Sequence, residues 1–82
     1  MERQEILNKF IQIIEDFYYI DLNINEKTKI VDLGIDDEYN SVIVEVELER
    51  NLKLPSESCD CFISDSETIK EVIDKISDLV NK

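Results

Sequence analysis

The sequence predicts an all-α fold, and two observations support that prediction. Glycine and proline, the residues that most often interrupt helices and build tight turns, occur only once each in 82 residues. Apolar residues also recur at spacings of three and four near both ends of the chain, the pattern of one helix face. A chain of this length has room for one domain, so residues 1–82 are expected to fold as a single unit.

The first predicted helix covers residues 3–18, where apolar side chains recur at helical spacing opposite charged and amide side chains. The apolar positions are Ile6, Phe10, Ile13 or Ile14, and Phe17. Residues 19–32 show no sustained period and are predicted to form a loop.

The segment at residues 42–52 fits two secondary structures. Apolar and polar side chains alternate through most of it, a pattern that by itself slightly favours a strand. Val44, Leu48 and Leu52 also share one helical stripe. A strand here would lack an obvious partner, because the other candidate, residues 30–33, is short.

The last predicted helix runs to the end of the chain. Ser64 precedes Glu67 by three residues, which is the spacing of a capping box at a helix start. The stripe that follows consists of Ile69, Val72, Ile73, Ile76 and Val80. Before it, the polar residues 56–65 are expected to contain a short helical turn around Phe62 and Ile63.

The charge balance narrows the choice of partners. Twenty acidic residues oppose nine basic ones, so the net charge is -11. Such a surface repels phosphate backbones and anionic lipid headgroups, which argues against nucleic acid and membrane as partners and favours a basic protein patch. The alternative is that the acidity only keeps the chain soluble.

The N-terminus is charged and has no apolar run of the kind found in a signal peptide, and no stretch approaches the roughly 20 apolar residues of a membrane span. Cys59 and Cys61 are separated by one residue, so a disulfide between them would be strained. We therefore expect two reduced thiols in a cytoplasmic protein.

The chain offers little material for catalysis. Histidine is absent, and no nucleophile–base pair or glycine-rich phosphate loop occurs. Two cysteines without histidine make half of a zinc site. We expect no catalytic residues, no metal site and no enzymatic activity.

Four stretches, taken in order, resemble acyl and peptidyl carrier proteins. Residues 28–36, with Asp-Leu-Gly at their centre, resemble the loop before that family's second helix, and Tyr-Asn-Ser-Val at 39–42 resembles the helix itself. Leu-Lys-Leu-Pro at 52–55 resembles its end, and residues 68–76 resemble the last helix. The resemblance covers nearly the whole chain. It implies a four-helix bundle of three main helices and one short one, and it favours helix over strand for residues 42–52.

One departure from the family matters for function. Carrier proteins have a serine at the start of the second helix, and this serine holds 4′-phosphopantetheine. Alignment forward from Gly34 places Asp37 at that position, and alignment backward from residues 39–42 places Glu38 there. Neither side chain can carry the group, so no cofactor is expected. A carboxylate there either mimics a carrier's phosphate or, more commonly, only caps the helix.

The sequence nevertheless retains an acidic stretch like the docking surface of the family, because residues 31–49 contain seven acids and no lysine or arginine. The resemblance implies a monomeric binding module that docks through an acidic second helix onto a basic patch of a carrier-recognising biosynthetic enzyme. The predicted partner-binding residues are Asp36, Asp37, Glu38, Glu45, Glu47 and Glu49.

The alternative is a genuine carrier that holds thioester intermediates on 4′-phosphopantetheine attached to Ser41, the nearest hydroxyl. In the family, apolar residues would follow that serine four and six positions later. Glu45 and Glu47 stand there instead, so the register does not match.

Overall fold

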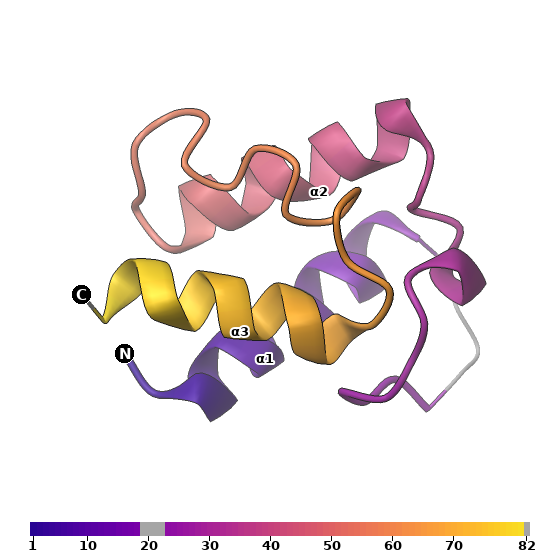
Figure 1. The fold of residues 1–82 in the computed structure, drawn as a ribbon, viewed down its shortest axis with the longest axis horizontal. Coiled ribbons are helices and arrows are strands. Elements are labelled where there is room, and N and C mark those ends of the chain that lie inside the picture. Colours follow the sequence, from indigo (N-terminus) through magenta and orange to yellow (C-terminus); the bar gives the residue numbers. More distant parts are fainter. Residues whose placement is uncertain (19–22, 82) are drawn as a thin grey trace.

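The computed structural model describes residues 1–18 and 23–81. It contains three α-helices, α1 (Arg3–Phe17), α2 (Glu38–Asn51) and α3 (Ile69–Val80), and a 3-10 helix, η1 (Val31–Leu33) (Figure 1). The described residues include no strand, and only an isolated antiparallel bridge joins Lys29 to Thr68. The predicted all-α class is therefore confirmed for this part of the chain.

Helix α1 packs against both α2 and α3 (Figure 1). The apolar faces of all three helices meet in one core. The predicted stripe of α1 is buried except at Phe17, whose side chain is half exposed at the end of the helix. The largest side chains that are fully buried are Phe10, Ile6, Ile14, Ile30, Ile35, Leu48, Ile63, Ile69, Ile73, Ile76, Val44 and Val72.

Residues 42–52 are not a strand, since α2 covers residues 38–51. Its buried face comprises Ser41, Val44, Glu45, Leu48 and Glu49, which follow the spacing of a helix. Val42 and Val46, which a strand would place on the same face as Val44, are exposed. The alternating pattern in the sequence therefore arises because two glutamates lie on the inner face of α2 and two valines, Val42 and Val46, lie on its outer face.

The turn before α2 depends on Gly34, which follows η1 in the left-handed conformation with φ 72°. Most other residues adopt that conformation only with strain, so the single glycine stands where the backbone requires it. Ile35, fully buried, then anchors the chain to the core directly before the acidic start of α2.

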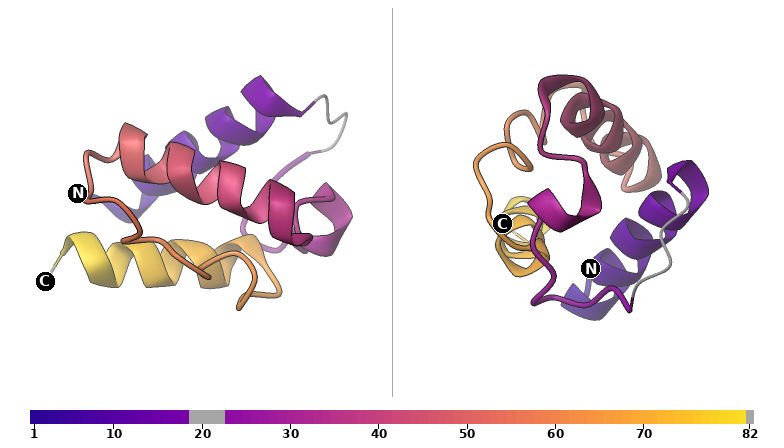
Figure 2. Two further views of the ribbon diagram at one scale, coloured as in Figure 1. Left: turned by 90° about the horizontal axis from the view of Figure 1, so that it is seen from above. Right: turned by 90° about the vertical axis from the view of Figure 1, so that its right-hand side faces the viewer.

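The start of α3 differs from the prediction. Thr68 is its N-cap and accepts the backbone N–H of Glu71, while the Glu71 carboxylate accepts the N–H of Glu67. Thr68 therefore caps α3 and Glu71 holds the residue before the cap, and the predicted capping box at Ser64 and Glu67 is wrong. Residues 56–65 follow a series of turns between α2 and α3 (Figure 2). The predicted helical turn around Phe62 and Ile63 is among them, since the Asp65 N–H donates to the Cys61 carbonyl at 2.9 Å.

Candidate functional site

Asp37, one of the two residues aligned with the carrier serine, is the N-cap of α2. Its carboxylate accepts the backbone N–H of Asn40 at 3.1 Å and the side-chain amide of Asn40 at 2.7 Å. The Asn40 side-chain oxygen in turn accepts the Tyr18 hydroxyl at 2.8 Å, which joins the end of α1 to the start of α2. Both oxygens of Asp37 are therefore engaged in holding the helix start.

These contacts shift two pKa values in opposite directions. The hydrogen bonds from Asn40 stabilise the ionised carboxylate and hold the pKa of Asp37 below its usual value. Burial, followed by the nearby negative charge of Asp37, raises the pKa of Tyr18. At neutral pH the start of α2 therefore carries a fixed negative charge beside a neutral phenol.

Glu38, the other aligned residue, is the first residue of α2 and is exposed. Ser41 lies one turn further along, and only 3% of its surface is exposed. Its hydroxyl donates to the Glu38 backbone carbonyl at 3.1 Å. A bulky phosphodiester on Ser41 would require this side chain to leave its place against the core, so Ser41 as placed here does not fit a phosphopantetheine arm.

The outer face of α2 carries three large apolar side chains on one stripe. Tyr39 is 74% exposed, Val42 is 48% exposed and Val46 is 39% exposed. Their spacing of three and four residues places them on the same side of the helix. The exposed acids Asp36 and Glu38 lie at the N-terminal end of this α2 stripe.

The predicted acidic docking face is only partly exposed. Glu45 and Glu49 were expected to face a partner, but they are 4% and 7% exposed because they continue the inner face of α2. Glu47 is partly exposed and pairs with Arg50 at 3.3 Å. Asp36, Asp37 and Glu38 are the predicted partner-binding residues that the structure leaves exposed.

The two buried carboxylates hold the segment that follows α2. Glu45 accepts the backbone N–H of Ile63 at 3.0 Å, and Glu49 accepts that of Cys59 at 2.9 Å. Buried carboxylates need such donors, because an unpaired buried charge is costly. One signal in the sequence could have indicated their burial, because the two glutamates are four residues apart and share a helix face with Ser41 and Leu48. It is easily missed, since glutamate is rarely found in a protein core.

The two cysteines occupy different environments. Cys59 is fully buried, and desolvation together with the charges of Glu49 and Glu45 raises the pKa of its thiol to about 12. Cys61 is exposed, and both cysteines are free thiols. Within the described residues, no three potential metal ligands come together in a way that would hold an ion.

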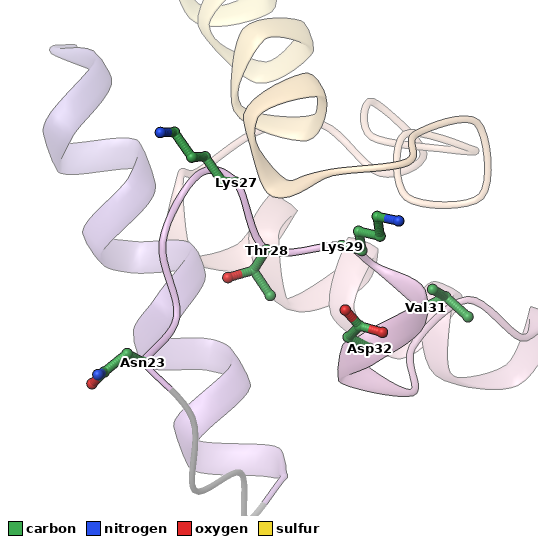
Figure 3. Close-up of a pocket in the computed structure, with 6 residues that line it drawn as sticks. All are labelled: Asn23, Lys27, Thr28, Lys29, Val31 and Asp32. Carbon is green, nitrogen blue, oxygen red and sulfur yellow. The ribbon is translucent and has the colours of Figure 1, made fainter.

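Several shallow hollows lie on the surface. One, of about 460 Å³, is formed by the loop before η1, where Lys27 and Lys29 point away from each other (Figure 3). Two others, of about 370 and 260 Å³, lie between α2 and residues 56–64 and share Val42, Glu45 and Asp60 in their walls. They form one open groove beside the α2 stripe.

Comparisons of the chain with protein-family models, with curated proteins and with solved structures gave no match. None of the helices in residues 1–18 and 23–81 is long and apolar enough to cross a membrane.

Proposed function

We propose that this chain is an acyl-carrier-protein-like binding module that docks through α2 onto a basic patch of a carrier-recognising biosynthetic enzyme. The observation that carries the proposal is the α2 stripe, three apolar side chains left in solvent on one helix face. Asp36 and Glu38 lie at one end of the stripe, and no lysine or arginine occurs from residue 31 to residue 49.

This combination suits a protein partner in two ways. Negative charge around the stripe speeds encounter with a basic surface and disfavours other partners. Burial of the tyrosine and valine side chains then supplies affinity, at about 25 cal/mol for each Å² of apolar surface removed from water. Tyr39, the most exposed of the three, is the kind of residue that most often dominates such an interface.

We further propose that the module works without a phosphopantetheine arm and without enzymatic activity of its own. The engagement of Asp37 as a helix cap and the burial of Ser41 support the absence of the arm, since no serine hydroxyl is exposed at the start of α2.

A modification assay tests the proposal. The wild-type chain is incubated with coenzyme A and a broad-specificity phosphopantetheinyl transferase, and its intact mass is measured. We expect no mass gain on wild type and a gain of one phosphopantetheinyl group on Asp37→Ser or Glu38→Ser. Serine caps helices about as well as aspartate, so Asp37→Ser should remain folded.

The same assay includes the outcome that would refute the proposal. A mass gain on wild type that Ser41→Ala abolishes would make the protein a genuine carrier attached at Ser41. A transferase that neither modifies any variant nor binds the wild-type chain would show that α2 is not a docking surface for this class of enzyme.

A further inference from the structure

The segment at residues 56–66 is held in place without regular secondary structure. It runs between α2 and α3, and both views of Figure 2 show it bridging these helices. Glu57 and Cys61 adopt left-handed backbone conformations, with φ values of 67° and 64°. Residues other than glycine reach this region only with strain, so the segment depends on contacts with its neighbours to stay in place.

Those contacts come from both helices. On the α2 side, the Glu45 and Glu49 carboxylates accept the N–H groups of Ile63 and Cys59, and both of these residues are fully buried. On the α3 side, the Lys75 ammonium donates to the Asp65 carbonyl at 3.0 Å and to the Ser66 hydroxyl at 2.8 Å. The segment thus holds its own Cys59 side chain buried, and the carboxylates of Glu45 and Glu49 lie beneath it.

The charges around these carboxylates are unfavourable. Asp60, on the segment itself, and Glu49 both face Glu45, and the Cys59 thiol lies near the two glutamates. The groove walls add three more acids, Asp36, Glu38 and Glu57, and contain no lysine or arginine. Lys75, which holds the far end of the segment, is the positive group that contacts it from α3.

We propose that residues 56–66 form a cover on α2 that opens and closes and that exposes its own buried Cys59 thiol when it opens, and that the charge on the carboxylates of Glu45 and Glu49 beneath it sets how readily it opens. Like-charge repulsion in a partly desolvated space favours the open form, in which water surrounds each carboxylate. The hydrogen bonds to the cover favour the closed form. Loss of one negative charge shifts this balance toward closure.

The pH dependence follows from Glu45. Burial, opposed by the N–H groups of Ile63 and Cys61, and the charges of Asp60 and Glu49 raise the pKa of this carboxyl above 4.5 while the cover is closed. In the open form water returns that pKa toward its ordinary value. The closed form therefore holds the proton more tightly. Closure is strongest near pH 4.5 and weakens as the pH rises through the raised pKa.

Thiol labelling measures the opening directly. In a Cys61→Ser chain, Cys59 is the only thiol, and 4,4′-dithiodipyridine modifies it only when the cover is open. The protection of Cys59 is the labelling rate of the urea-unfolded chain divided by that of the folded chain at the same pH. This ratio removes the pH dependence of the thiol's own reactivity. We expect this protection to fall between pH 4.5 and pH 8, by at most about tenfold per pH unit, because a single proton is released.

Two further variants assign the effect. Glu45→Gln keeps an oxygen that accepts the Ile63 N–H but carries no charge, so its protection at pH 7 should rise to the level that the parent reaches at low pH and should not vary with pH. Glu47→Gln, a matched change on the same helix at a residue that pairs with Arg50 instead, should behave as the parent does. If Glu45→Gln does not fold, Glu49→Gln should show the same gain in protection.

Two results would overturn the proposal. Protection of Cys59 that is flat with pH, together with lower protection in Glu45→Gln, would mean that the carboxylate acts only as a structural clamp. Protection equal to the global unfolding constant, measured by urea denaturation at the same pH, would mean that the segment opens only when the whole chain unfolds.

Discussion

Three valines of α2 provide the sharpest test of its orientation. Val44 is fully buried, whereas Val42 is 48% exposed and Val46 is 39% exposed. A helix therefore predicts unequal costs for valine-to-alanine substitutions at these positions. A strand would place all three valines on one face and predict similar costs.

The magnitudes follow from what each substitution removes. Val44→Ala deletes two buried methyl groups, worth about 0.8 kcal/mol each, and adds a cavity cost of about 0.8 kcal/mol. The better helix propensity of alanine returns about 0.5 kcal/mol, so the net loss of stability is about 2 kcal/mol. At Val42 and Val46, partial exposure and helix propensity nearly cancel, and the change is within about 0.5 kcal/mol.

Urea denaturation followed by circular dichroism at 222 nm measures all three variants. For a domain of this size, about 2 kcal/mol corresponds to a fall in Tm of roughly 8–16 °C, which also makes thermal melts decisive. Equal losses at the three positions would refute the helical orientation, as would a larger loss at Val42 than at Val44.

Three further predictions concern stability. Thr68→Ala should cost about 1 kcal/mol in urea denaturation because it removes the N-cap of α3, while Thr68→Ser should cost little; an equal loss in both would contradict the capping role. Lys70 and Arg3 hold the pKa of Asp74 below its ordinary value, so this pair stabilises the fold above about pH 3.8 and ceases to do so as the pH falls through the lowered pKa. Asp74→Asn should thus destabilise the chain by under about 1 kcal/mol at pH 7, because the pair is partly exposed, and its difference from wild type should shrink as the pH falls below about 3.8. Raising the ionic strength to about 0.15 M should raise the Tm, because salt screens charges over about 8 Å and so relieves repulsion in a chain of net charge -11. A Tm that does not change with salt would show that the acids do not cluster.

The helices at the two ends of the chain were predictable because their apolar and polar residues separate cleanly on the helix surface. Helix α1 ends one residue before its predicted end, and the stripe of α3 is buried as expected at Ile69 and Ile76. Helix α2 was ambiguous for a physical reason. Glu45 and Glu49 occupy its inner face because they find backbone donors in a segment far along the chain, and no local pattern reports such donors.

The candidate site was predictable in part. The acids before α2 indicated a helix start, and Asp37 caps it as that pattern suggests. The α2 stripe was not predicted, since exposure of Val42 and Val46 follows only from the burial of the opposite face. The cover that contains Cys59 was likewise unpredictable, because it depends on side chains of α2 reaching backbone groups 10 and 18 residues away.

The proposed docking role of α2 can be tested with an isotope-labelled chain and a phosphopantetheinyl transferase as the carrier-recognising enzyme. Backbone amide shifts are followed by NMR for wild type and for Val46→Lys, which places a positive charge in the α2 stripe; Lys75→Arg serves as a distant control. The account predicts shifts confined to α2 and the residues just before it, loss of binding in Val46→Lys, and no change in the control. Shifts centred on α1 or α3, or unaltered binding by Val46→Lys, would contradict it.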